Sequence, residues 1–179
     1  SIINSDDEHA PYFADFSADR QLSYAWQTPG ATYLASVVDI DATGARLSIN
    51  DATTHVSFVT PFEHKNTLAA IATVASLGFP LADVARAAEK LRQVPGRFER
   101  VFAGQPFQVV VDYAYEPYAL QALYDAVKSV WGNVRIIGVH GSAGGGRDVS
   151  RRPAIGKLAA TYEDVVIVTN EDPYDEDPR

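Results

Sequence analysis

Three nearly continuous apolar runs, separated by two helical segments, are the strongest constraint on the fold of this chain. The runs are FQVVVDYAY, VRIIGVHG and DVVIVTN, and runs of this kind are typical of strands buried on both faces of a parallel sheet. Between them lie PYALQALYDAVKSVW, with Pro117 in its first turn, and RRPAIGKLAATY, both predicted to be helices. The order strand, helix, strand, helix, strand predicts a doubly wound α/β unit.

The first half of the chain has a different pattern. Residues 1–6 predict a short buried strand, and TYLASVVDIDATGARLSIN predicts a hairpin that turns at residues 42–44. HVSFVTPF is expected to be a third antiparallel strand. NTLAAIATVASLG predicts a helix that ends at Gly78, and LADVARAAEKLRQV a second helix that ends at Pro95-Gly96. The change of pattern divides the chain into domains 1–95 and 96–179.

Composition excludes several classes of protein. There is no cysteine, so neither a disulfide framework nor a thiolate zinc site is expected, and the four scattered histidines do not form a metal-binding motif. The net charge of −8 argues against a nucleic-acid-binding surface. No apolar run approaches the ~20 residues of a membrane helix, and no signal-peptide pattern opens the chain. These features predict a cytoplasmic protein without a membrane or nucleic-acid partner.

Polar groups follow all three strands of the second half. They are Asp112, the loop 141–148 and the segment 170–172. Ligands bind at the carboxyl ends of the strands in open parallel sheets. We therefore expect a binding edge there.

The glycine-rich loop itself is open to three interpretations: a phosphate cradle, an amino-acid pocket or a loose loop. It follows a strand and precedes a helix, where backbone N–H groups favour an anion. It is not a P-loop, because the pattern G-x-x-x-x-G-K-[ST] is absent from the chain. Arg147, Arg151 and Arg152 favour binding of a carboxylate or a phosphate, because a guanidinium group contacts either anion through two parallel hydrogen bonds.

Two further residues have more than one interpretation. Asp112 either caps the helix that begins at Pro117, binds a ribose hydroxyl or binds a magnesium-bound water. Arg97, in PGRFERV at the domain junction, is either an ordinary surface arginine or a cation that holds a nucleotide phosphate.

Six motifs, in order, span nearly the whole chain. They are INSDD at 3–7, FEHKN at 62–66, GRFE at 96–99, DYAYEPYAL at 112–120, GGGRDVSRRP at 144–153 and NEDPY at 170–174. Together they resemble the Mur ligases, the ATP-dependent amino-acid ligases of peptidoglycan synthesis. The motif D-Y-A-x-x-P-x-x-L is most similar to that of the family members that add the third residue of the stem peptide.

The resemblance implies an α/β fold in two incomplete parts. Residues 1–95 would be the later part of the central ATPase domain, an antiparallel hairpin with helices. Residues 96–179 would be the first part of a Rossmann-like βαβαβ C-terminal domain. The P-loop, the UDP-sugar domain and most Mg²⁺ ligands would lie upstream. The chain has no methionine, even at its first position, and we expect a piece of a longer protein.

The resemblance also implies roles for individual residues, with ATP and Mg²⁺ as cofactors and no metal ligand or catalytic residue assigned within this chain. Asn66 would contact adenine, Asp112 and Tyr113 the ribose, and Arg97 the phosphates. Arg151 stands where the family has a lysine near the phosphates, and Arg147 would bind the α-carboxylate of the incoming amino acid, with Asp148 beside it in the motif.

The sequence departs from the family pattern at several positions. Glu63 replaces an asparagine and Tyr115 a histidine, both in nucleotide-binding motifs. Members that select meso-diaminopimelate carry Asn-Pro-Arg, where this chain has Asp172, Pro173 and Tyr174. An acid and a missing arginine favour a side-chain amine, so L-lysine is expected over meso-diaminopimelate. Acids at 171, 172, 175 and 176 agree with that charge preference.

The expected substrates are therefore UDP-MurNAc-L-Ala-D-Glu and a diamino acid, joined through an acyl phosphate, and the chain alone is expected to be inactive. Two alternatives remain: a related folylpolyglutamate or cyanophycin type of ligase, and a non-catalytic α/β binding module. The sequence leaves the oligomeric state open.

Overall fold

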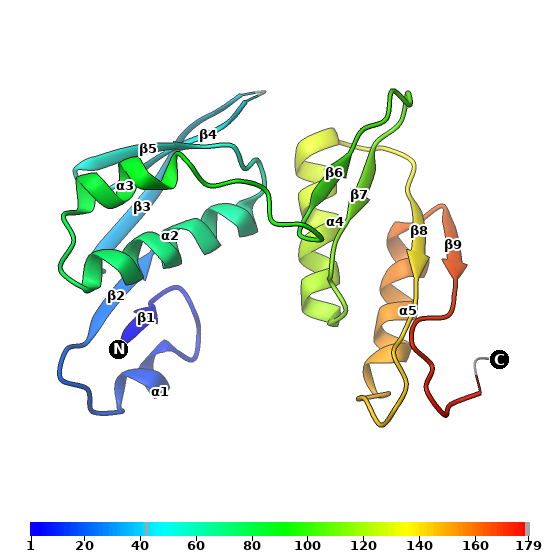
Figure 1. The fold of residues 1–179 in the computed structure, drawn as a ribbon. Helices are drawn as coiled ribbons and strands as arrows, with labels where there is room; N and C mark the ends of the chain where they lie inside the picture. The colour runs from blue at the N-terminus through cyan, green and yellow to red at the C-terminus, as the bar shows by residue number, and fades with distance from the viewer. Residues whose placement is uncertain (42, 178–179) are drawn as a thin grey trace. The chain divides into compact units, whose positions relative to one another are not determined.

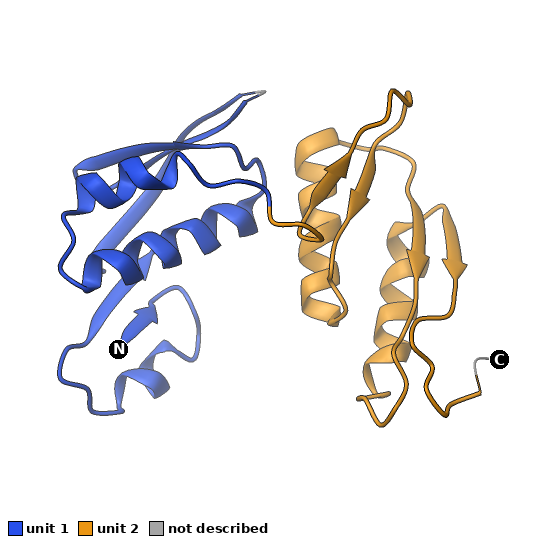
Figure 2. Cartoon of the chain, viewed as in Figure 1, with its two compact units in different colours: residues 1–93 blue, residues 94–179 orange. Residues whose placement is uncertain are grey.

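The computed structural model describes residues 1–41 and 43–177. The chain forms two compact units, Ser1–Gln93 and Val94–Arg179 (Figure 2), each of which is described by itself. The boundary expected from the sequence, between residues 95 and 96, falls two residues later.

The first unit is built on a five-stranded mixed sheet in the order β1-β2-β3-β4-β5 (Figure 1). The strands β1 (Ile2–Asn4), β2 (Leu22–Ala25) and β3 (Tyr33–Asp41) are parallel neighbours. The strands β4 (Gly44–Ile49) and β5 (Ala52–Val56) continue the sheet antiparallel. The predicted strand near the N-terminus and the hairpin are therefore confirmed. Ala42, in the predicted turn, lies outside the described residues.

Three helices complete this unit: α1 (Ala10–Ala14), α2 (Pro61–Ser76) and α3 (Leu81–Ala88). The sequence-based bounds need three corrections. The third antiparallel strand ends at Val56 instead of running to Phe62. Helix α2 begins five residues before Asn66, because Thr60 and Glu63 form a capping box ahead of Pro61. Helix α3 ends at Ala88, since Lys90, Leu91 and Arg92 beyond it are exposed and bury no apolar face.

The core of the first unit lies between the sheet and helices α2 and α3. Its fully buried side chains include Leu47, Ile49 and Leu68, with Val84 and Ala88 contributed by α3. Thr54 of β5 adds a buried hydrogen bond of 2.7 Å from its hydroxyl to the Ala85 carbonyl. This bond joins the sheet to α3.

The second unit contains two small sheets and two helices. Strands β6 (Glu99–Val101) and β7 (Val109–Val111) pair antiparallel, and β8 (Ile137–His140) and β9 (Val165–Val168) pair parallel. The helices α4 (Pro117–Trp131) and α5 (Arg151–Tyr162) have the predicted bounds. Mixed α/β architecture is thus confirmed. The expected three-stranded parallel sheet is not formed among the described residues. Instead β7 pairs with β6, a strand that the sequence analysis did not predict.

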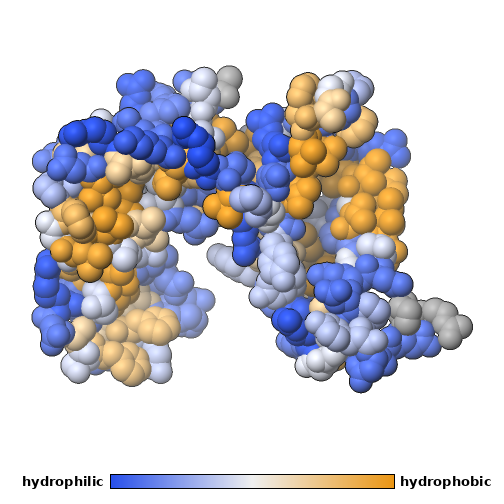
Figure 3. Space-filling model, viewed as in Figure 1, coloured by the Kyte–Doolittle hydropathy of each residue, from blue (hydrophilic) through white to orange (hydrophobic). Residues whose placement is uncertain are grey.

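Hydrophobic surface remains exposed in both units (Figure 3). In the first unit it includes Leu77 and Phe79 beside α2 and α3. In the second, Ile137, Val139 and Ile167 share one face of the β8–β9 pair and are 59%, 64% and 45% exposed. No described helix is both long enough and apolar enough to cross a lipid bilayer.

Gly44 provides a test of the hairpin geometry. Its φ is +147°, and a Cβ there would overlap the carbonyl oxygen of Val56 on the neighbouring strand. Gly78 also has a positive φ, +100°, but a Cβ there meets nothing within 4 Å. We expect Gly44→Ala to lower the free energy of unfolding by about 3 kcal/mol, and the control Gly78→Ala by about 1–2 kcal/mol. Urea unfolding measures both, and equal losses would contradict the close contact.

Candidate functional site

The glycine-rich loop and the segment after β9 lie against each other. The Gly144 amide donates a hydrogen bond of 3.1 Å to the Asp172 carbonyl oxygen. A Cβ on Gly144 would overlap the Pro173 carbonyl, and one on Gly145 would come within 2.8 Å of the Tyr174 ring. The interpretation as a loose loop is therefore wrong. Two of the three polar clusters expected at strand ends meet here.

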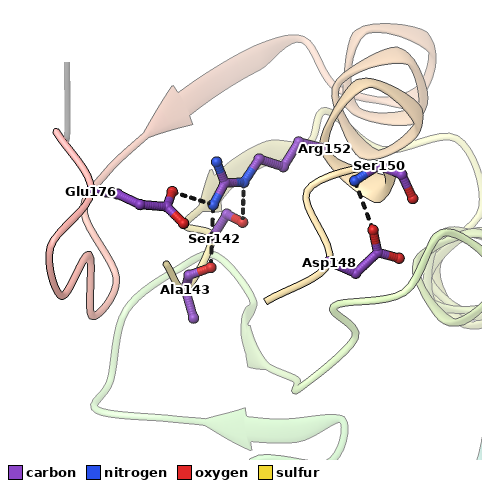
Figure 4. A network of polar contacts seen from close by, with 6 residues as sticks. All are labelled: Ser142, Ala143, Asp148, Ser150, Arg152 and Glu176. Atoms are coloured by element: carbon purple, nitrogen blue, oxygen red, sulfur yellow. Dashed lines mark hydrogen bonds and ion pairs between the residues drawn. The ribbon is translucent and has the colours of Figure 1, made fainter. Parts of the chain in front are cut away.

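Arg152 joins these two segments (Figure 4). Its Nε donates to the Ser142 hydroxyl at 2.9 Å, and its Nη2 donates to the Ala143 carbonyl at 3.3 Å. The same Nη2 forms an ion pair of 2.7 Å with Glu176. Glu176 is therefore neutralised, and does not act as one of the free acids counted in the sequence.

The predicted amino-acid-binding residues flank this junction. Arg147 is exposed and forms no ion pair within the described residues. Asp148 accepts a hydrogen bond of 2.8 Å from the Ser150 amide. Hydrogen bonds from the side chain and the backbone of Ser150 hold the pKa of the Asp148 carboxyl below its usual value. Asp148 thus stays ionised and shapes the turn into α5.

Four of the predicted nucleotide-binding residues form one continuous chain of contacts in the second unit. The Arg97 guanidinium lies 5.3 Å from the centre of the Tyr113 ring, and that of Arg151 lies 4.8 Å from the Tyr115 ring. The two rings meet edge to face at 5.1 Å. Arg151 also pairs with Glu116 at 2.7 Å. The arrangement presents two cations beside two exposed aromatic rings.

Asp112 has a different role from a helix cap. Its Oδ2 accepts a hydrogen bond of 2.6 Å from the Phe98 amide, whereas the N-cap of α4 is Glu116. Phe98 has φ +45°, so Asp112 holds a strained residue next to Arg97. The capping interpretation of Asp112 is wrong. This bond joins the residue after Arg97 to the residue before Tyr113, and so holds the two contacting residues near each other.

Asn66 belongs to the first unit. It is exposed on α2, three residues after Glu63. Glu63 itself is buried and serves structure: its carboxylate accepts hydrogen bonds from Thr60 and from Gln93, whose Nε2 lies 3.0 Å away. Glu63, which replaces an asparagine of the nucleotide motif, thus takes part in the capping box of α2.

A buried carboxylate beneath the glycine-rich loop was missed by the sequence analysis. The Glu163 side chain is only 1% exposed and accepts hydrogen bonds of 2.6 Å from the Tyr124 hydroxyl and from His140 Nε2. Burial and the Glu163 carboxylate raise the pKa of Tyr124 well above its usual value. His140 is the last residue of β8, so this cluster supports the strand that leads into the loop. No motif signals it, because its members lie on three separate elements.

Comparison with known proteins shows which family the chain resembles. Residues 96–179 match the family model described as Mur ligase, glutamate ligase domain. The chain is 34% identical over 99% of its length to the UDP-N-acetylmuramoyl-L-alanyl-D-glutamate–2,6-diaminopimelate ligase of Bacillus velezensis, of which it covers 36%. It is 38% identical to the UDP-N-acetylmuramyl-tripeptide synthetase of a Roseiflexus species, again over 99% of its length and covering 35% of that protein. A solved structure of a UDP-N-acetylmuramoyl-L-alanyl-D-glutamate–2,6-diaminopimelate ligase superimposes with a TM-score of 0.56 at 26% identity. That match covers 99% of this chain and 38% of the solved one.

Residues 96–179 belong to the Mur ligase family, and the chain as a whole is similar to Mur ligases. The resemblance inferred from the six motifs is thereby confirmed. The chain spans about a third of the length of the curated Mur ligases that it matches.

The buried Tyr124–Glu163 bond in this Mur ligase domain predicts a dependence of stability on alkaline pH. Tyr124→Phe removes the donor, and we expect a loss of about 1–2 kcal/mol in the free energy of unfolding near pH 8. The raised pKa means that the folded state keeps its proton when the unfolded tyrosine, with a pKa of 10.0, ionises. The wild-type advantage is therefore complete below pH 10 and decreases above it.

Urea unfolding of the wild type and the variant at about pH 8 and about pH 11 measures this difference. Because all other tyrosines are common to both proteins, their titration cancels. A difference that stays constant across this range would contradict the buried hydrogen bond.

Proposed function

We propose that this protein is an ATP-dependent acid–amino-acid ligase of peptidoglycan precursor synthesis, acting in the cytoplasm. It would add a diamino acid to UDP-MurNAc-L-Ala-D-Glu. The observation that carries the proposal is that two groups of predicted ligand-binding residues lie together in one unit. The chain of contacts from Arg97 to Arg151 forms one group, and the junction of the glycine-rich loop with residues 172–176 forms the other.

The first group fits a nucleotide. Arg97 and Arg151 are the candidate phosphate ligands. The Arg151 side chain is 12% exposed and paired with Glu116, so it would exchange that partner for a phosphate oxygen. Tyr113 and Tyr115 offer exposed ring faces, and Asp112 lies directly before Tyr113 for contact with the ribose. For Asn66, in the first unit, contact with adenine stays a prediction from the family motif.

The described residues contain no group of three or more His, Cys, Asp or Glu side chains able to hold a metal. As the family resemblance implies, the proposal assigns no magnesium ligand to the described residues. Mg²⁺ would neutralise phosphate charge when bound elsewhere in the enzyme.

The second group fits an amino acid. Arg147 is exposed on the loop for the α-carboxylate, with Asp148 fixing the turn behind it. Asp172 and Tyr174 lie on the segment that contacts this loop, and the ring of Tyr174 packs on Gly145. Because Glu176 is neutralised by Arg152, the acids left for a substrate ammonium group are Glu171, Asp172 and Asp175. The acid at 172 and the absence of an arginine at 174 favour L-lysine over meso-diaminopimelate.

The reaction would proceed in two steps. The carboxylate of the UDP-MurNAc-dipeptide attacks the γ-phosphorus of ATP, forming an acyl phosphate and releasing ADP. The amino group of the diamino acid then attacks the acyl carbon, phosphate leaves, and the amide bond forms. Residues of this chain would position the nucleotide and the amine and stabilise phosphate charge.

The test is ATP-dependent ligation to UDP-MurNAc-L-Ala-D-Glu, comparing L-lysine with meso-diaminopimelate. We expect activity with lysine from the intact gene product that contains this chain, and none from residues 1–179 alone, which carry no P-loop. A preference for meso-diaminopimelate would support the proposed ligase function and contradict the assignment of lysine as the substrate. Turnover of neither, in a folded protein, would favour another ligase of this fold or a binding module.

The variant Asp172→Asn with Tyr174→Arg tests the specificity residues directly. It removes the charge that attracts an ammonium group and adds one that attracts a carboxylate. We expect the ratio of kcat/KM for lysine over meso-diaminopimelate to fall at least tenfold, about 1.4 kcal/mol. Asp125→Asn, an exposed acid on α4 that belongs to neither group of site residues, is the control, and an equal fall in that variant would contradict the assignment.

A further inference from the structure

Two neighbouring arginines in the first turn of α5 point to different groups of site residues. Arg151 contacts the Tyr115 ring and Glu116, on the nucleotide side. Arg152 contacts Ser142, Ala143 and Glu176, on the amino-acid side (Figure 4). One helical turn thus carries a cation into each of the two groups.

The segment on the amino-acid side has an unfavourable backbone. Asp172 has φ +35° and Tyr174 has φ +54°, in a region that residues other than glycine rarely adopt. Such conformations persist only where surrounding contacts hold them. The backbone contacts present are the Gly144 amide on the Asp172 carbonyl, at 3.1 Å, and the Glu176 amide on the Pro173 carbonyl, at 3.0 Å.

Arg152 is the side chain that spans this arrangement. Its two loop acceptors lie just before Gly144, and its carboxylate partner lies just after Tyr174. The pair is about one third exposed, with 35% of the Arg152 side chain and 33% of the Glu176 side chain accessible. An isolated surface ion pair contributes little, but here one guanidinium serves three acceptors on two chain segments.

We infer that the Arg152–Glu176 pair is the positioning element of the amino-acid pocket. It holds the strained 172–174 segment against the loop that carries Arg147, and so sets the distance between the residues that receive the α-carboxylate and those that receive the side-chain amine. The inference rests on the proposed function. It assigns to Arg152 a role that is separate from that of Arg151.

Amide hydrogen exchange tests the structural half of the inference without any need for activity. In the folded 179-residue chain, Arg152→Gln and Glu176→Gln should each speed exchange in peptides 141–147 and 170–176 about five- to tenfold. Exchange in α4 should be unchanged. Arg152→Lys, which can keep the ion pair but not all three contacts, should give an intermediate effect. Unchanged exchange in both peptides would overturn the inference.

Kinetics of the intact gene product test the functional half. We expect Arg152→Gln to raise KM for the amino acid about tenfold while KM for ATP stays within about twofold. Arg151→Gln, the matched variant one residue away, should do the reverse. The charge swap Arg152→Glu with Glu176→Arg should recover part of the loss seen in Arg152→Glu alone. A parallel rise in both KM values, or no rise for the amino acid, would overturn the positioning role.

These two measurements separate the inference from the function on which it rests. If the wild type ligates nothing, the assignment of an amino-acid pocket fails, whereas faster exchange in the variants would still establish the Arg152 contact between the two segments. If the wild type is active and exchange does not change, the proposed function stands and the positioning pair is rejected.

Discussion

The parallel pairing of β8 with β9 is the constraint on which the candidate site depends. With Ile137 opposite Val165 and His140 opposite Val168, both strands end at the same edge. The Thr169 amide extends the ladder with a bond of 2.8 Å to the His140 carbonyl. The chain leaves this edge twice, once as the glycine-rich loop and once as the 170–176 segment. Their contact follows from the register of the two strands.

Support for this edge comes from beneath it. Glu163 joins α4, through Tyr124, to the end of β8, through His140. A Cβ on Gly138 would overlap the Glu163 carboxylate, so the strand approaches the buried acid closely. The rings of Tyr124 and Tyr162 stack at 4.8 Å and pack the two helices together. These contacts hold the end of β8 beneath the candidate site, as a site that positioned substrates would require.

Local signals account for what the sequence predicted well. Pro117 in the first turn and Gly132 after the last turn mark the two ends of α4, and the spacing of its apolar residues indicates a helix between them. The family resemblance followed from motif order, which needs no geometry. Strand β6 was missed because Glu99–Val101 is short, charged and exposed, without an apolar pattern. The start of α2 was placed late because Thr60 was assigned to the predicted strand HVSFVTPF and Glu63 to a nucleotide motif, so that their capping box was not recognised.

Pairings between distant residues were beyond sequence reasoning. Arg152 and Glu176 are 24 positions apart, and Tyr124 and Glu163 are 39 apart, so only the tertiary fold brings them together. Glu176 illustrates the consequence. The sequence analysis counted Glu176 among the acids that would attract an amine, whereas in the fold Glu176 forms an ion pair with Arg152.

Ligand-dependent hydrogen exchange on the intact gene product tests the central claim, that one unit carries two adjacent binding groups with separate ligands. The account predicts that ADP protects peptides covering residues 97–116, and that L-lysine protects peptides covering 144–148 and 170–176. Protection of one common set of peptides by both ligands, or of neither set by either ligand, would contradict it.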